Sequence, residues 1–251
     1  MTRLWPALLG VALLVCRGVD AHAQARTVRL PSATLGGERV FAVLLPANYT
    51  ESEQRYPVLY LFHGGGQDHT AFMARTGFPG LARQHAMIVV MPAADRNYTA
   101  QASEAQARYH DFVAGDLVDY VDAHYRTIAS QQGRAIGGIS MGGRIAIMTA
   151  LQHPARFGAV GAFSPAVRQD AEEAVGKAEG SVTYFYISCG TRDSLLPANR
   201  EFVAQLKHHH LAHDFKEIDG GEHAWNVWDP ELGVFFDLLS TREAWRQKRA
   251  F

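Results

Sequence analysis

The segment Gly138–Gly142, with the sequence GISMG, limits the possible folds of this chain more than any other. Its serine, Ser140, lies where a short apolar run, 134–139, gives way to a helix-like stretch, 144–151. A turn from strand to helix within so few residues brings backbone atoms close together, and flanking glycines remove the Cβ atoms that would collide. We therefore expect Ser140 to stand exposed above the end of a strand, with the backbone N–H of Met141 directed at the same point.

Strand-like and helix-like segments alternate along the rest of the chain. Apolar runs that predict strands lie at 40–45, 58–62, 87–91, 135–139, 159–163, 182–189 and 215–218. Apolar residues at helical spacing lie between them, at 112–121, 145–151, 202–206 and 227–239. Apolar strands separated by helices are typical of a mostly parallel sheet covered on both faces, so we expect an α/β fold, a three-layer sandwich. The first two runs, joined through 46–49, are expected to pair as an antiparallel edge.

Length and charge indicate a single domain without an obvious charged partner. A chain of 251 residues can bury a sizeable core, and no internal repeat or linker divides it. We expect residues 26–251 to form that domain. The formal net charge of −1 gives no reason to expect nucleic acid or an anionic membrane as a partner, and nothing in the sequence sets an oligomeric state.

Residues 1–25 have the features of a secretory signal peptide. Arg3 precedes an apolar stretch, 4–15, and small residues offer cleavage sites after Ala23 and after Ala25. We therefore expect a secreted or periplasmic protein with no integral membrane segment after cleavage. A lipoprotein attached through Cys16 is the weaker alternative, because Val15 is a poor small residue for lipidation.

Two loops after later strands carry candidates for the acid and base that a nucleophilic serine requires. Asp193 follows the run 182–189 and is placed to orient a histidine. His223 lies in a glycine-rich loop after the last predicted strand and before a helix that is expected to begin near 226, and it is the candidate general base. Three rival acids fit less well, because they precede a strand, open one, or lie too near the histidine: Asp170, Asp214 and Asp219.

The third chemical element is His63–Gly66, with the sequence HGGG, directly after the first buried strand. Backbone N–H groups of such a glycine loop supply the second donor to an oxyanion, beside the N–H of Met141. Gly65 is the preferred donor and Gly66 the next, while His63 is interpreted as a brace for the loop.

No metal site is predicted. The run His208–His210 is the one candidate tract, but it lies at the end of a helical pattern and no second ligand cluster accompanies it. After removal of the leader, Cys189 remains as the single cysteine, so no internal disulfide is expected. Its apolar surroundings indicate a small buried side chain and not a nucleophile.

These motifs together resemble the esterase D-like superfamily of α/β-hydrolases. The matching segments are 61–65, 116–122, 125–127, 137–143, 190–193 and 221–225, and the resemblance extends over nearly all of the chain after the leader. That group includes feruloyl and acetyl-xylan esterases, tributyrin-type esterases, enterochelin esterases, S-formylglutathione hydrolases and mycolyltransferases. The resemblance implies the α/β-hydrolase fold and a triad of Ser140, Asp193 and His223. One departure is Glu222 where many members have glycine. Folded inward, its carboxylate would favour the protonated form of the neighbouring ring.

The expected activity is that of an exported serine carboxylesterase of the feruloyl or acetyl esterase type. It would hydrolyse a small-molecule or polymer-borne ester through an acyl-enzyme, with no metal or organic cofactor. An acyltransferase of the mycolyl kind would use the same triad, and a non-catalytic binding protein of this fold is disfavoured by the intact triad.

Substrate contacts are less constrained by the sequence. Trp225 and Trp228 follow the candidate base and would flank an aromatic or sugar ring, or equally pack against the core, and Gly66 is a further candidate contact. The connection 93–109, which contains Tyr98 and Tyr109, is long enough to wall a pocket. No large insertion is present to form a lid, which favours an open cleft.

Overall fold

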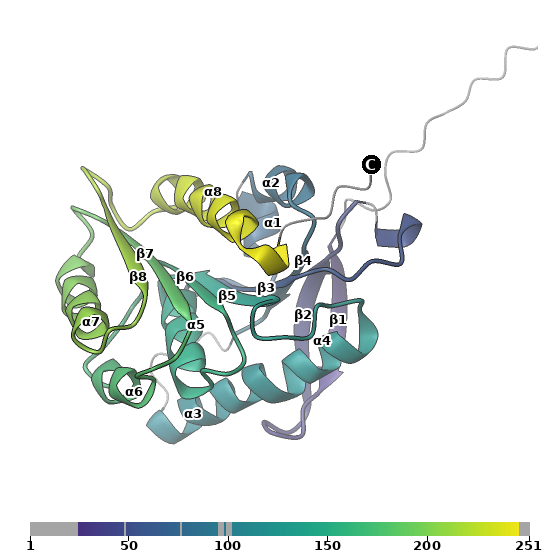
Figure 1. Cartoon of the computed structure of the whole chain (residues 1–251), viewed down its shortest axis with the longest axis horizontal. Coiled ribbons are helices and arrows are strands. Elements are labelled where there is room, and N and C mark those ends of the chain that lie inside the picture. The colour runs from purple at the N-terminus through teal and green to yellow at the C-terminus, as the bar shows by residue number, and fades with distance from the viewer. Residues whose placement is uncertain (1–24, 48, 76, 95–97, 99–101, 246–251) are drawn as a thin grey trace, which may run out of the picture.

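A computed structural model describes residues 25–47, 49–75, 77–94, 98 and 102–245. Their backbone forms one eight-stranded sheet with the strand order β1-β2-β4-β3-β5-β6-β7-β8 (Figure 1). The strands are β1 (Arg26–Pro31), β2 (Glu38–Leu44), β3 (Val58–Phe62), β4 (Ile88–Pro92), β5 (Arg134–Ile139), β6 (Ala159–Phe163), β7 (Tyr184–Gly190) and β8 (His213–Ile218). The predicted signal peptide, apart from its last residue, lies outside the described residues, and so does Cys16.

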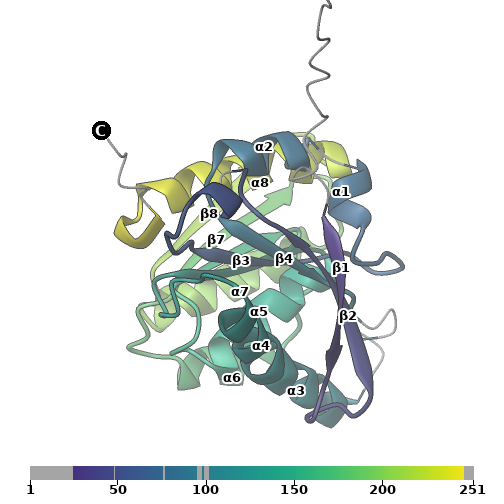
Figure 2. The ribbon, with the colours of Figure 1, turned by 90° about the vertical axis from the view of Figure 1, so that its right-hand side faces the viewer.

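Helices cover both faces of this sheet (Figures 1 and 2). One face carries α1 (Ala71–Arg75), α2 (Phe78–Gln84) and α8 (Trp225–Thr241). The other carries α3 (Ser103–Phe112), a π-helical turn (Val113–Leu117), α4 (Val118–His124), α5 (Met141–Gln152), α6 (Ala171–Lys177) and α7 (Leu196–His208). Short 3-10 turns lie at Tyr49–Glu51 and Glu243–Trp245. The three-layer α/β sandwich predicted from the sequence is therefore confirmed.

The central strands are apolar because each of their two faces packs against a helical layer. In β3 all five residues are buried. Val58, Tyr60 and Phe62 contact the layer of α3 to α7, while Leu59 and Leu61 contact the layer of α1, α2 and α8. Alternation of the two faces along a strand explains why the run has no polar position.

The predicted antiparallel pairing of 40–45 with 58–62 is wrong. Strand β2 pairs antiparallel with β1 on one side and with β4 on the other, while β3 runs parallel to both β4 and β5. A strand buried on both faces takes a central place, so β3 lies inside the sheet and β4 separates it from β2. The antiparallel edge is instead formed by β1, whose exposed residues, among them Arg26 and Arg29, hide it from a search for apolar runs.

The connection predicted over 93–109 is shorter than expected, because α3 begins at Ser103. Tyr98 and Tyr109 are both buried, and Tyr109 lies on that helix. Among the described residues, none of the helices combines the length and apolar composition needed to cross a bilayer.

Candidate active site

Ser140 occupies a strained turn between β5 and α5, at the edge of the sheet where the parallel strands end. Its φ of 52° is rare for a residue with a side chain and is held by its surroundings. The Ser140 N–H donates to Phe163 O at 2.9 Å, which ties the turn to the end of β6. A Cβ on Gly142 would lie 2.1 Å from Phe62 O, and one on Gly138 would lie 2.5 Å from the carbonyl carbon of Gly142. Both flanking positions therefore require glycine, as the sequence pattern predicts.

Three predicted site residues form one hydrogen-bonded chain. His223 Nε2 lies 2.9 Å from Ser140 Oγ, and His223 Nδ1 lies 2.7 Å from Asp193 Oδ2. A carboxylate only accepts, so Nδ1 carries the ring proton, and Nε2 accepts from the serine hydroxyl. The Asp193 side chain is fully buried, whereas 36% of the imidazole surface is exposed. The other carboxylate oxygen accepts the Leu195 N–H at 2.9 Å, so both oxygens of the buried acid have partners.

The loops after β7 and β8 are joined by backbone contacts that fix the acid beside the imidazole. Arg192 N–H donates to Gly221 O at 2.8 Å, and Thr191 N–H donates to Ile218 O at 2.9 Å. A Cβ on Gly190 would lie 2.2 Å from Gly221 O. Because the two loops touch backbone to backbone, Asp193 and His223 are brought together although 30 positions separate them in the chain.

Glu222 does not fold toward the imidazole. Its carboxylate lies 3.5 Å from the guanidinium of Arg192, and both side chains are about two-thirds exposed. An ion pair so exposed contributes little to stability. Glu222, which replaces the glycine of many family members, is therefore a surface residue of this loop and forms its ion pair with Arg192.

Two of the rival acids have other partners. Arg144, itself 1% exposed, donates two hydrogen bonds to Asp170, and these hold the pKa of that carboxyl below its usual range. Asp214 accepts a hydrogen bond from the Tyr184 hydroxyl. Asp193 is the acid whose carboxylate is hydrogen bonded to His223.

The two predicted oxyanion donors are the backbone N–H groups of Met141 and Gly65. Within the part of the chain that the structure describes, the N–H groups of Met141 and Gly65 donate to no carbonyl or side chain. Gly142, in the first turn of α5, packs against the carbonyls of Phe62 and His63, so this helix begins beside the HGGG loop. The arrangement leaves two N–H groups available to an oxygen bound near Ser140.

His63 braces the HGGG loop. It is buried, and its Nδ1–H donates to Gly64 O at 2.8 Å while its Nε2 accepts the Ala94 N–H at 3.0 Å. The Gly64 N–H donates to the side chain of Gln67 at 3.1 Å. These bonds fix the loop and leave the exposed Gly65 and Gly66 at its tip.

The two tryptophans predicted as substrate contacts lie beside the imidazole. Trp228 is buried, its Nε1–H donates to Ser164 Oγ at 3.0 Å, and its ring meets the His223 ring edge-on at 4.8 Å between centroids. Trp225 is half-buried and packs edge-on against Phe72 and Trp228. Trp228 thus supports the imidazole from the core, and a contact of either ring with substrate stays a prediction.

Neither Cys189 nor the histidine tract forms a second reactive centre. Cys189 is buried, and burial is the main cause that raises its thiol pKa to about 12. His209 lies 3.3 Å from Glu179 at the end of α7. Among residues 25–47, 49–75, 77–94, 98 and 102–245, no three His, Cys, Asp or Glu side chains are grouped so as to hold a metal ion.

Comparison with known proteins adds a family and several relatives. Residues 32–236 match the protein-family model described as "Putative esterase". Over 144 residues the chain is 34% identical to Esterase Rv1288 of Mycobacterium tuberculosis (strain H37Rv), and this match covers 54% of this chain and 31% of that protein. The chain therefore spans about a third of the length of that relative.

Two further proteins resemble a larger share of the chain. The endo-1,4-beta-xylanase/feruloyl esterase of Xylanibacter ruminicola is 26% identical over 222 residues, which are 82% of this chain and 30% of that enzyme. The structure of FphF, a fluorophosphonate-binding serine hydrolase of Staphylococcus aureus, superposes with a TM-score of 0.77 at 20% identity. That superposition covers 86% of this chain and 98% of the other, and it concerns the fold.

Proposed function

We propose that this chain, which belongs to the esterase family matched over residues 32–236, is a serine hydrolase that acts on ester bonds. Ser140 is the nucleophile, His223 the general base and Asp193 the acid that orients it. The observation that carries the proposal is the hydrogen-bonded chain from Ser140 Oγ through His223 to Asp193, with distances of 2.9 and 2.7 Å.

Acylation begins when His223 Nε2 accepts the Ser140 hydroxyl proton as Oγ attacks the ester carbonyl carbon. The carbonyl oxygen becomes an oxyanion that the N–H groups of Met141 and Gly65 stabilise. The buried Asp193 carboxylate stabilises the imidazolium formed in this step. When the tetrahedral intermediate collapses, the bond to the alcohol oxygen breaks, and the Nε2 proton passes to that oxygen.

Hydrolysis of the acyl-enzyme repeats these steps with water as the nucleophile. His223 removes a proton from the water as its oxygen attacks the acyl carbon, and the same two N–H groups hold the second oxyanion. Breakage of the bond to Ser140 Oγ releases the carboxylic acid, and the proton returns from His223 to the serine.

The proposed substrates are feruloyl or acetyl esters, free or carried by a polymer. The name of the Xylanibacter relative, a feruloyl esterase joined to a xylanase, supports this class and favours hydrolysis over acyl transfer. The exposed imidazole and the exposed tip of the HGGG loop are consistent with an open cleft that admits a polymer-borne ester. Export through residues 1–25 would bring the enzyme to such a substrate.

The test compares the parent protein with Ser140→Ala on p-nitrophenyl acetate, p-nitrophenyl butyrate and methyl ferulate. The proposal expects turnover by the parent that disappears in the variant, and the ratio among the three esters reports the acyl preference. A folded parent that hydrolyses every ester no faster than Ser140→Ala would contradict it. Sequencing the N-terminus of the protein recovered from an exporting host tests cleavage after Ala23 or Ala25.

A further inference from the structure

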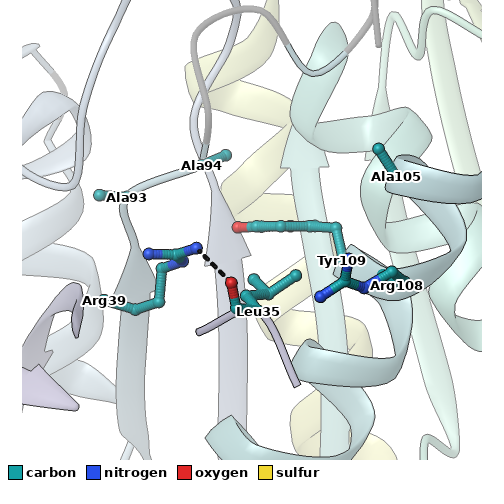
Figure 3. A pocket seen from close by; sticks show the side chains of 7 residues that line it. All are labelled: Leu35, Arg39, Ala93, Ala94, Ala105, Arg108 and Tyr109. Carbon is teal, nitrogen blue, oxygen red and sulfur yellow. Dashed lines mark hydrogen bonds between the residues drawn. The ribbon is translucent and has the colours of Figure 1, made fainter. Parts of the chain in front are cut away.

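A pocket of about 380 Å³ opens at the same edge of the sheet as Ser140, on the side of β2 and β4 (Figure 3). Ala93 and Ala94, which follow β4, form one wall of it. Arg39 of β2 and Arg108 of α3 flank it. Its volume lies in the range of pockets that hold small molecules.

The pocket is close to Ser140 and bonded to the HGGG loop. Strands β4 and β5 both flank β3 and run parallel to it, so the ends of β4 and β5 are two strand spacings apart, roughly 10 Å. The Ala94 N–H donates to His63 Nε2, and His63 donates to Gly64 O. A molecule of moderate length can therefore occupy the pocket and reach Ser140 at once.

Both arginines point at one short stretch of backbone. Arg39 Nη2 donates to Leu35 O at 3.4 Å, and Arg108 Nη2 donates to Thr34 O at 2.7 Å. Because these carbonyls belong to consecutive residues, the two guanidinium groups lie near one another, and Figure 3 shows them on either side of Leu35. Each guanidinium has five N–H donors, and these contacts, with a bond from Arg39 to Glu38 O, leave most of them available.

The positive charge of this pair has no carboxylate partner among the described residues. Two neighbouring acids are bonded elsewhere, and Glu104, one turn before Arg108 on α3, is exposed and forms no ion pair with it in the described part of the chain. Glu38 pairs with Arg29 at 2.6 Å, and Asp116 accepts hydrogen bonds from Ser32 and Thr34. An uncompensated pair of guanidinium groups beside a pocket favours an anionic ligand.

The other walls restrict the kind of anion. Leu35, Ala105 and the ring of Tyr109 give the pocket an apolar lining. The N–H groups of Ala93 and Ala94 are already hydrogen bonded, to Val40 O and His63 Nε2. Two guanidinium groups beside an apolar lining fit an amphipathic anion, and a carboxylate on an apolar group is the simplest such anion.

We propose that this pocket binds a carboxylate attached to an apolar ring or chain, held by Arg39 and Arg108. His223 protonates the leaving alcohol, so the alcohol portion of an ester lies toward β7 and β8, and the acyl portion lies toward the HGGG loop and β4. The carboxylate is therefore either the far end of the acyl portion of the substrate or a separate acid bound beside it. The first source rests on the proposed function, whereas binding itself does not.

The binding test uses benzoate as the probe and benzyl alcohol as its uncharged match, titrated by calorimetry into Ser140→Ala, which separates binding from turnover. Arg39→Gln and Arg108→Gln are expected to weaken benzoate binding at least fivefold, and benzyl alcohol binding is expected not to respond. Arg55→Gln is the matched control, because Arg55 is also exposed and donates to one backbone carbonyl, that of Thr127, at the opposite edge of the sheet. Benzoate affinity that is the same in all three variants overturns the proposal.

Both arginines also bond to the 32–37 turn, so their replacement could disturb that turn. Two further measurements distinguish a lost ligand contact from a disturbed turn. Arg39→Lys and Arg108→Lys keep the charge without the planar fork and are expected to bind benzoate with intermediate affinity. In the unsubstituted pocket, benzoate binding is expected to weaken several-fold between low and 0.5 M salt, a concentration at which exposed charges are screened over about 4 Å. Binding that does not respond to salt contradicts a site made of exposed guanidinium groups.

A kinetic arm identifies the source of the carboxylate. The p-nitrophenyl monoester of sebacic acid and p-nitrophenyl decanoate have acyl chains of equal length that differ in the terminal carboxylate. A higher kcat/KM for the monoester that is lost in Arg108→Gln assigns the carboxylate to the substrate. Equal kcat/KM values together with arginine-dependent benzoate binding assign it to a separate acid. Turnover of p-nitrophenyl acetate in the same assay reports independently on the proposed function.

Discussion

Two regions at the carboxyl edge of the sheet satisfy their polar groups in opposite ways. Around β5, β7 and β8, the side chains of Ser140, His223 and Asp193 bond to one another. Around β2, β4 and α3, Arg39 and Arg108 donate to backbone carbonyls and keep charged N–H groups beside a pocket. The side chains of the first region are paired with one another without a ligand, and the second region carries charge that a ligand would compensate. Under the two proposals above, the first region cleaves the ester and the second binds an anion.

The largest expected effect concerns the first region alone. Ser140→Ala should lower kcat for p-nitrophenyl acetate by about 10⁶-fold, the loss typical of removing a nucleophilic serine, and leave the unfolding temperature close to that of the parent. Ser194→Ala is the matched control, because Ser194 is an exposed serine beside Asp193. Comparable losses in the two variants would break the assignment of cleavage to Ser140.

Glycines distinguish the packed turn at Ser140 from the open HGGG loop. Gly142→Ala should destabilise the fold by about 3 kcal/mol or more, because the new Cβ would lie 2.1 Å from Phe62 O. Gly65→Ala should stay within about 0.5 kcal/mol of the parent, since no atom lies within 4 Å of the corresponding Cβ position. Urea unfolding of both variants measures the difference. A Gly142→Ala protein as stable as Gly65→Ala would mean that the turn between β5 and α5 is not packed as described.

The placement of residues at strand ends could be predicted from the sequence because it depends on local features. Glycines around Ser140 reflect a turn that allows no Cβ, and the positions of Asp193 and His223 follow from the chain order of loops after strands. The alternation of apolar strands and helices also identified the fold. These features depend on a few neighbouring residues or on burial on both faces, and both leave a clear pattern in the chain.

Features that depend on distant pairing could not be found in this way. The partners of β2 depend on which strand enters the centre of the sheet, and the polar face of β1 conceals the edge strand. Arg39 and Arg108 are far apart in sequence, and the 32–37 turn and α3 bring them together. No spacing in the sequence indicates that they lie close. The short helices α1, α2 and α6 contain too few turns to show a helical period.

A buried histidine between α3 and α5 gives the fold a pH dependence. His110 of α3 hydrogen bonds to Tyr98 and to Thr149 of α5, and burial lowers its pKa from 6.5 to about 3. The unfolded chain gains a proton near pH 6.5 that the folded chain does not, so stability is expected to fall as the pH drops from 6.5 toward 3. The loss attributable to this group is at most about 1.4 kcal/mol per pH unit.

Urea unfolding at pH 7 and pH 5 tests this dependence. His110→Gln should lose less stability than the parent between the two values, while His208→Gln, which alters an exposed histidine, should follow the parent. An identical loss in the parent and in His110→Gln would show that other groups set the acid limit.

The smallest expected effect is at the surface of the histidine loop. Glu222→Gln removes an exposed ion pair with Arg192 and should change the free energy of unfolding by less than about 0.5 kcal/mol. Its kcat/KM for p-nitrophenyl acetate should match that of the parent within twofold. A tenfold change in kcat/KM would show that this carboxylate acts on the imidazole, and that the first region extends to the surface.

Covalent labelling with a fluorophosphonate tests the central claim most directly. Attack by an activated serine forms a bond from Oγ to phosphorus, releases fluoride and passes the hydroxyl proton to the imidazole. Digestion and mass spectrometry should find one adduct, on the peptide that carries Ser140, and labelling should slow by orders of magnitude in His223→Ala. A folded protein that forms no adduct, or that forms it on another residue, would contradict the account.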